Sequence, residues 1–125
     1  MARKRSPILT EAELRIMKIL WEKGSATVKE LVEGLPKNVD LAYTTILTTL
    51  QYMQRKGLVR HEEPGRAYVY YPLVEQREAR RSAVRFIVNR FFEDSPELLV
   101  LNILEHEKLS QRDINRLKKL LDEDE

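Results

Sequence analysis

The stretch AYTTILTTLQYMQRKGLVRHEEPGRAYVYYP, residues 42–72, decides the fold. Its first half has apolar residues at helical spacing, which predicts a helix from Asp40 or Ala42 to Gly57. The pattern then changes to a period of two, with β-forming residues on either side of a Pro-Gly turn at 63–66. The stretch therefore predicts a helix that is followed directly by a β-hairpin.

Two capping boxes precede this stretch. Thr10 and Glu13 have the spacing of the first box, and the helix that follows is expected to stop at Gly24. Thr27 and Glu30 form the second box, ahead of a shorter helix. The order helix, short helix, helix, hairpin is that of a winged helix-turn-helix, whose third helix fits the major groove of DNA. We expect a mainly α fold with a small β-hairpin, followed by a C-terminal helical dimerisation domain.

The third predicted helix has two unlike faces. Ile46, Leu50 and Met53 are expected to face the core, whereas hydroxyl, amide and guanidinium groups on the other faces can reach base edges or phosphates. Threonine is a mediocre helix former, so four threonines within six residues are a costly choice for a merely solvated face, which is the alternative. The expected DNA-binding residues, with two arginines that flank the hairpin turn, are Tyr43, Thr44, Thr45, Thr48, Gln51, Tyr52, Arg55, Arg60 and Arg66. A basic arm at residues 3–5 either adds phosphate contacts or is an ordinary disordered tail.

Aromatic residues of the hairpin have two interpretations. Tyr68, Tyr70 and Tyr71 could form a stacking platform for single-stranded nucleic acid. We favour packing of the hairpin's inward positions against the first helix. Trp21 is likewise expected to belong to the core rather than to a ligand site.

Three further helices are predicted after the hairpin, at 74–92, 98–105 and from Ser110 onward. The helix at 98–105 is apolar nearly all round, so a two-fold partner would bury the faces that a small subdomain leaves exposed; a compact monomeric subdomain is the alternative. We assign residues 1–72 to a winged-helix DNA-binding domain and 73–125 to a helical dimerisation domain. The expected dimerisation residues are Phe86, Phe91, Leu98, Leu99, Leu101, Ile103, Leu117 and Leu120.

Composition excludes several classes of protein. The 125 residues include no cysteine, which rules out disulfides, thiolate metal sites and cysteine nucleophiles. The apolar runs are too short for a membrane span, and no apolar signal segment follows the charged N-terminus, which predicts a cytoplasmic protein without a membrane partner. Residues 1–72 hold 12 basic and 8 acidic residues, whereas residues 73–125 hold 10 and 12, so a polyanion is expected to meet the first half.

Catalytic and metal sites are not indicated. The sequence has no Gly-rich phosphate loop, no HExxH and no Gly-x-Ser-x-Gly motif. Glu105, His106 and Glu107 are adjacent on a predicted helix, so their side chains point in different directions and do not form a shared metal site. We expect no enzymatic activity, no metal and no cofactor.

The chain resembles the BlaI/MecI/CopY group of penicillinase repressors over nearly its whole length, from about Leu9 to Leu121. The resemblance is based on Leu9–Leu14 with Ile19–Trp21, on Ala42–Ile46 with Arg55–Val59 and Tyr70–Pro72, and on Ser95–Asn102 with Leu109–Ser110. It implies a dimeric transcriptional repressor that binds double-stranded operator DNA. Such repressors control β-lactamase, penicillin-binding-protein or copper-handling genes.

The resemblance also implies a mode of release. In the β-lactam branch a regulatory protease system leads to cleavage of an Asn-Phe bond in the dimerisation region, and the matching bond here is Asn102–Ile103. The copper branch has a C-terminal cysteine cluster, which this chain lacks. A basic residue is common in the β-lactam repressors where this chain has Leu47. These differences imply another protease preference and another operator sequence.

Two other functions remain open. A protein-interaction adaptor would use the helix at 98–105 as its docking surface, and would bind DNA weakly and without regard to sequence. A ligand-sensing regulator would have a small-molecule pocket around Tyr71 and Phe86, and its thermal stability would depend on the ligand.

Overall fold

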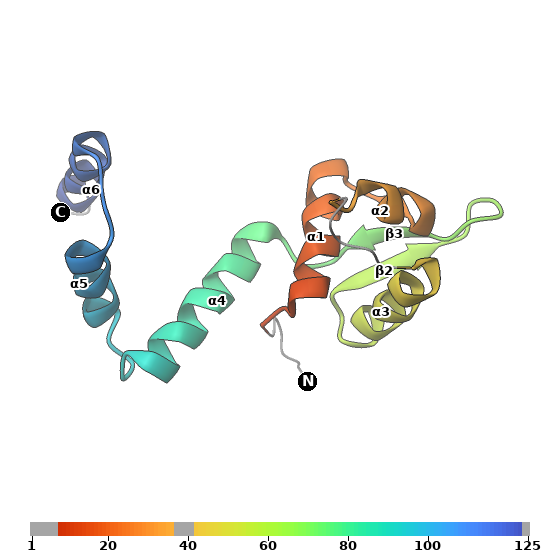
Figure 1. Ribbon diagram of the computed structural model, residues 1–125, viewed down its shortest axis with the longest axis horizontal. Coiled ribbons are helices and arrows are strands. Elements are labelled where there is room, and N and C mark those ends of the chain that lie inside the picture. Colours follow the sequence, from red (N-terminus) through yellow and green to blue (C-terminus); the bar gives the residue numbers. More distant parts are fainter. Residues whose placement is uncertain (1–7, 37–41, 124–125) are drawn as a thin grey trace. The chain divides into compact units, whose positions relative to one another are not determined.

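The computed structural model describes residues 8–36 and 42–123 (Figure 1). The predicted third helix begins after Ala42, at Tyr43; the predicted start at Asp40, the core position Leu41 and the basic arm at 3–5 lie outside the described residues. In chain order, the elements are α1 (Glu11–Lys23), β1 (Ala26–Thr27), α2 (Val28–Gly34), α3 (Tyr43–Arg55), β2 (Val59–Glu62), β3 (Val69–Pro72), α4 (Gln76–Phe91), α5 (Pro96–His106) and α6 (Gln111–Glu123).

Both predicted capping boxes are confirmed. The Thr10 hydroxyl accepts a hydrogen bond from the backbone N–H of Glu13, and the Glu13 carboxylate accepts one from the backbone N–H of Thr10. Thr27 and Glu30 repeat this exchange at the start of α2. Gly24 ends α1 with a φ of 89°, a conformation that glycine adopts without the strain of a Cβ.

The hairpin is part of a three-stranded antiparallel sheet of order β1-β3-β2. The sequence predicted β2 and β3 as runs at 58–62 and 67–71, but β3 begins only at Val69, so Ala67 and Tyr68 belong to the loop. The strand β1 was not predicted, because a two-residue strand has no periodicity to detect. It pairs Ala26 with Tyr70 and thereby attaches the hairpin to the segment between α1 and α2.

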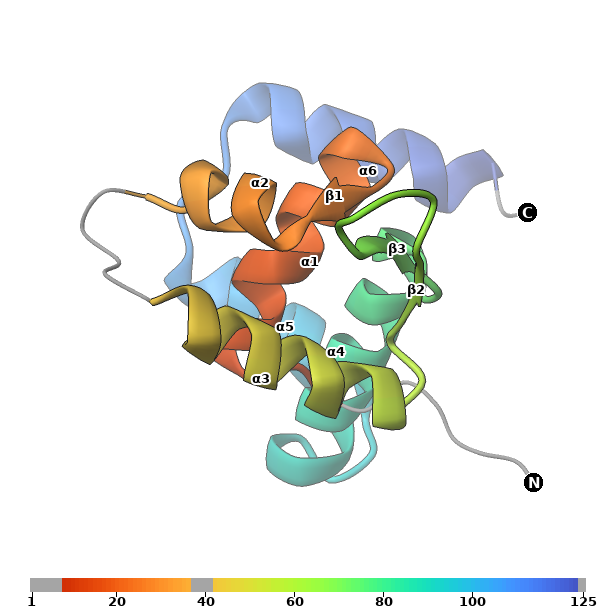
Figure 2. The same cartoon turned by 90° about the vertical axis from the view of Figure 1, so that its right-hand side faces the viewer.

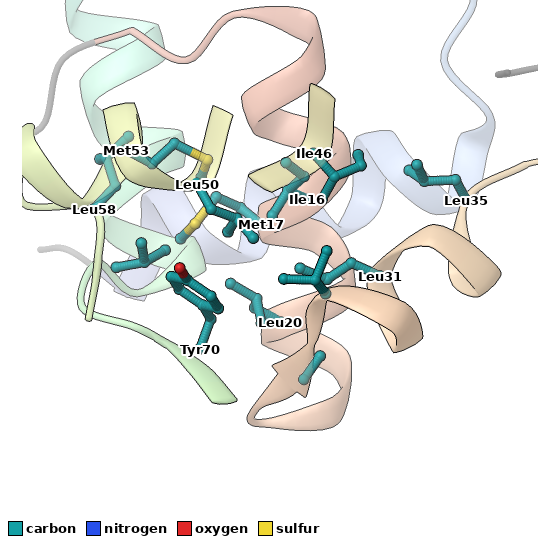
Figure 3. Close-up of a cluster of buried hydrophobic side chains, with 13 residues drawn as sticks. Ile16, Met17, Leu20, Leu31, Leu35, Ile46, Leu50, Met53, Leu58 and Tyr70 are labelled. Carbon is teal, nitrogen blue, oxygen red and sulfur yellow. The ribbon is translucent and has the colours of Figure 1, made fainter. Parts of the chain in front are cut away.

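A single buried cluster joins the three helices and the sheet (Figure 3). The predicted inward residues of α3, Ile46, Leu50 and Met53, are fully buried against side chains of α1 and α2 and against Tyr70 of β3. Trp21 packs at the edge of this cluster, and its indole N–H donates to the carbonyl oxygen of Val74 at 2.7 Å. Figure 2 shows the resulting order, with α3 in front of α1 and β2 beside the end of α3.

The chain divides into two compact units, and the division falls between Val84 and Arg85, inside α4. The second unit has well-formed helix starts: the Ser95 hydroxyl caps α5, and Ser110 and Asp113 exchange hydrogen bonds at the start of α6. Its described residues nevertheless bury only one side chain, that of Val88. None of the described helices is long and apolar enough to span a membrane. The assignment of residues 1–72 and 73–125 to two functions stays a prediction.

Candidate nucleic-acid interface

The outward face of α3 is polar and open to solvent. It begins with Tyr43, which is 54% exposed, and it continues past Tyr52, which is 55% exposed. The predicted DNA-binding residues of this helix are all exposed: Tyr43, Thr44, Thr45, Thr48, Gln51, Tyr52 and Arg55. At 100° per residue, Thr44, Thr48, Gln51 and Arg55 form one stripe opposite the buried face. The structure therefore brings together on one surface the residues that the sequence singled out on α3.

The four threonines of α3 do not share one environment. Thr44, Thr45 and Thr48 are exposed, whereas Thr49 is half-buried. The Thr49 hydroxyl donates to the backbone carbonyl of Thr45 at 2.8 Å. Because this bond occupies its donor within the helix, Thr49 is the one threonine of the four with a local role in the described structure.

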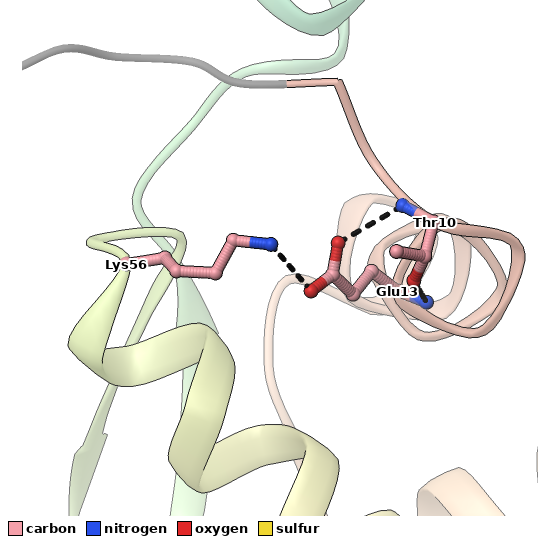
Figure 4. Close-up of polar contacts among 3 residues, drawn as sticks. All are labelled: Thr10, Glu13 and Lys56. Atoms are coloured by element: carbon pink, nitrogen blue, oxygen red, sulfur yellow. Dashed lines mark hydrogen bonds and ion pairs between the residues drawn. The ribbon is translucent and has the colours of Figure 1, made fainter.

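A buried carboxylate links the two ends of this interface (Figure 4). Glu13 is 2% exposed and uses one oxygen for the capping bond to Thr10. Its other oxygen lies 2.7 Å from the ammonium group of Lys56, the residue that caps the C-terminus of α3. A positive charge is favourable at the C-terminus of a helix and a negative charge at the N-terminus, so the pair suits both helices that it joins.

The end of α3 carries a small cationic cluster. The Lys56 ammonium lies 5.3 Å from the centre of the Tyr52 ring, and the Arg55 guanidinium lies 5.6 Å from it. Both distances are within the range of a cation–π contact. Arg55 is exposed, whereas Lys56 is held by Glu13.

One face of the hairpin neutralises its own arginine. The Arg60 guanidinium lies 2.7 Å from the Glu62 carboxylate and 4.2 Å from the centre of the Tyr71 ring. The hydrogen bond and the charge of Arg60 lower the pKa of Glu62 from its ordinary value of 4.5. Both side chains are about half exposed, so the pair is weak and Arg60 can exchange Glu62 for a phosphate at little cost.

The other face of the hairpin packs against α3. The His61 imidazole Nδ1 lies 2.7 Å from the Gln54 side-chain oxygen, which joins β2 to α3. Tyr68 stacks on the same imidazole with the ring centres 4.6 Å apart. A hydrogen bond to Glu63 raises the pKa of Tyr68, and burial raises that of Tyr70. The predicted inward packing therefore holds for Tyr70, which is fully buried, but it is wrong for Tyr68, which is exposed, and Tyr71 is half-buried under Arg60.

Arg66 lies in the exposed loop between β2 and β3. Among the described residues it has no ion-pair partner, in contrast to Arg60. The wing thus presents one arginine that is free of carboxylates and one that is engaged.

The predicted dimerisation residues lie on the helices of the second unit. Phe91 is 70% exposed, and Leu99 is the half-buried exception. The exposed members are Phe86, Phe91, Leu98, Leu101, Ile103, Leu117 and Leu120. Asn102 and Ile103, the predicted cleavage positions, are exposed within α5.

The described residues contain no group of three histidine, aspartate or glutamate side chains that could hold a metal ion. His106 and Glu105 approach each other only to 3.9 Å at the exposed end of α5. Sequence reasoning missed other functional contacts: the Lys56–Glu13 pair and the His61–Gln54 pair. The capping box indicated Glu13, but no local pattern could indicate its partner 43 residues away.

Comparisons with known proteins agree with this geometry. The family model described as "Penicillinase repressor" matches residues 9–123. The chain is 32% identical over 120 residues to the penicillinase repressor of Bacillus licheniformis, covering 96% of this chain and 94% of that protein. It is 28% identical over 113 residues to the methicillin resistance regulatory protein MecI of Staphylococcus aureus, covering 90% and 92%. The solution structure of monomeric Bacillus licheniformis BlaI in complex with the blaP half-operator matches with a TM-score of 0.51 at 32% identity, covering 61% of this chain and 93% of that one.

Proposed function

The chain belongs to the penicillinase repressor family of DNA-binding transcriptional repressors, and from this membership we propose that two copies occupy a dyad-symmetric operator and exclude RNA polymerase. Such a repressor acts in the cytoplasm, on chromosomal DNA. The names of the relatives point to genes that protect against β-lactams as the regulated class.

The observation that supports this function best is the outward face of α3. Its threonines and Gln51 have the size and the hydrogen-bonding groups to read base edges, and a threonine methyl group can contact that of thymine. Arg55 and the tyrosine hydroxyls suit phosphate contacts, which fix the position of the helix on the duplex. Arg66 is placed at the wing loop, where a free cation can enter a narrow minor groove.

Dimerisation supplies the symmetry of the operator. The apolar residues of the second unit are exposed in the single chain, which is the condition of a surface that another copy covers. A two-fold dimer places two recognition helices on two half-sites, and the second contact is then intramolecular. This linkage converts two weak half-site contacts into one strong complex.

We propose release by cleavage between Asn102 and Ile103. The bond lies in α5, after every described contact that holds α3. Cutting there leaves the winged helix folded but removes the surface that joins it to a second copy. Each monomer then retains only half-site affinity. If the cut protein stays dimeric and keeps full operator affinity, this mechanism is wrong.

Fluorescence anisotropy tests the central claim. The full chain is titrated into its own upstream promoter duplex and into a scrambled duplex at several salt concentrations. We expect a preference of at least about a thousandfold for the promoter near physiological salt, with binding that weakens steeply as salt rises.

Charge-matched variants sharpen the result. Arg66→Gln is expected to weaken binding, whereas Lys23→Gln, which removes an exposed charge from the last turn of α1, is expected to leave binding unchanged. Equal and weak binding of the wild-type chain to both duplexes would contradict the repressor function and favour the protein-interaction adaptor.

A further inference from the structure

We propose that Glu13 determines specificity by keeping Lys56 away from the DNA backbone. The inference rests on the proposed function, because it concerns how that interface discriminates its operator from other DNA. Glu13 touches no DNA in this account; it acts through Lys56 and is a positioning residue.

The contacts of Glu13 make it a strong holder of a cation. Its side chain is 3% exposed, and the distance to the Lys56 ammonium is 2.7 Å. The first carboxylate oxygen is fixed by the backbone N–H of Thr10, so the second oxygen has a set direction. A carboxylate that is buried to this degree needs its cation, because losing the partner leaves an uncompensated charge away from water.

Lys56 is placed where a free ammonium would meet the duplex. It follows Arg55 directly, and its ammonium lies 5.3 Å from the ring of Tyr52, which is 55% exposed. Its side chain is itself 28% exposed, so it is not confined to the interior. Glu13 is its only ion-pair partner among the described residues. Once the charge of Glu13 is removed, the phosphate backbone is the strongest anion within its reach.

Holding this cation back favours the operator over other DNA. Phosphate contacts add affinity for every sequence, whereas base contacts add affinity for the operator alone. The freed Lys56 would strengthen binding to random DNA, which α3 does not read. The wing contains a similar pair, Arg60 and Glu62, but that pair is half exposed and yields easily. The burial of Glu13 is what separates Lys56 from Arg60.

Glu13→Gln is the direct test. The glutamine oxygen can still accept the Thr10 hydrogen bond, so the variant removes the charge and preserves the cap. We expect it to bind the scrambled duplex about fivefold more tightly near 0.1 M salt, and to steepen the dependence of log affinity on log salt by about 0.9. The preference for the promoter duplex falls by a similar factor. An effect on stability alone changes neither the slope nor the preference at a temperature where the protein is fully folded.

Two further variants complete the test. Glu13→Gln combined with Lys56→Gln removes the freed cation, and we expect the salt slope to return to that of the wild type. Lys56→Gln alone retains an amide that can donate to Glu13, and its slope is expected to equal the wild-type slope.

The outcomes separate the two proposals. A wild-type slope and preference in Glu13→Gln would overturn the inference. A slope that falls by about 0.9 in Lys56→Gln alone would also overturn it, because Lys56 would then contact phosphate in the native complex. If the wild-type chain itself does not prefer its promoter, the proposed function fails before the inference is tested.

Discussion

Replacing Thr48 by alanine is expected to weaken operator binding while it stabilises the protein. Thr48 is exposed on the central stripe of α3, and no hydrogen bond within the described structure uses its hydroxyl. Its neighbour Thr49 is half-buried, and its hydroxyl donates to the Thr45 carbonyl at 2.8 Å. Thr49→Ala is therefore the matched control: the same chemical change on the same helix, away from the DNA surface.

The two effects have opposite signs and different sizes. Alanine is a better helix former than threonine by about 0.6 kcal/mol, so each substitution is expected to raise the free energy of unfolding by up to that amount. The bond from Thr49 to Thr45 is of a kind that slightly disfavours a helix, so its loss does not cancel the gain. Loss of a base contact at Thr48 costs about 1–3 kcal/mol of binding, which corresponds to roughly a 5- to 150-fold loss of operator affinity.

Two assays separate these effects. Trp21 is the single tryptophan of the chain and belongs to the first unit, so its fluorescence in urea reports the unfolding of that unit. Anisotropy with the promoter duplex measures binding. If Thr48→Ala binds within twofold of the wild type, the threonine-rich face is only solvated, and the assignment of Thr48 to the interface is wrong.

Four further outcomes are expected. Lys56→Met leaves the buried Glu13 carboxylate without its cation and is expected to lower the free energy of unfolding by about 3 kcal/mol in the same Trp21 assay; an unchanged urea midpoint would show that the pair is not formed. Gly24→Ala places a Cβ on a backbone with a φ of 89° and is expected to cost about 1 kcal/mol in that assay, a loss that a relaxed α1 terminus would abolish. Burial raises the pKa of Tyr70 above its ordinary value of 10.0, so the unfolded chain loses this proton first and stability declines as the pH rises through that value; urea unfolding between about pH 8 and pH 11 should show the decline, and Tyr70→Phe should reduce it. Leu120→Lys puts a charge on an exposed apolar position and is expected to raise the dimer dissociation constant by more than about tenfold in sedimentation equilibrium, whereas an unaltered dimer would place the interface elsewhere.

The parts of the fold that local chemistry specifies could be predicted from the sequence. Thr10 and Thr27 start their helices through side chains three residues away, and Gly24 ends a helix through its own φ. The spacing of Ile46 and Leu50 identified the buried face of α3, and the exposed polar face followed from it.

Contacts between distant residues could not be predicted in this way. The pairing of Ala26 with Tyr70 creates β1, and neither residue has a neighbour that indicates a strand. The partners of Glu13 and His61, Lys56 and Gln54, are set by how α1, α3 and the hairpin pack. Arg60 was predicted from its position beside the turn, but its engagement with Glu62 and Tyr71 depends on the register of the sheet.

The single buried residue of the second unit has a consequence in time. Because Val88 alone is buried among its described residues, a newly made chain has little to stabilise its last helices until it meets another copy. In a dimer that forms in this way, the rate at which working repressor appears rises with the square of the chain concentration. Shortly after synthesis begins, or after cell division halves a small pool, repression would therefore lag behind the amount of protein. A cell would acquire a delay from a core that each chain leaves incomplete.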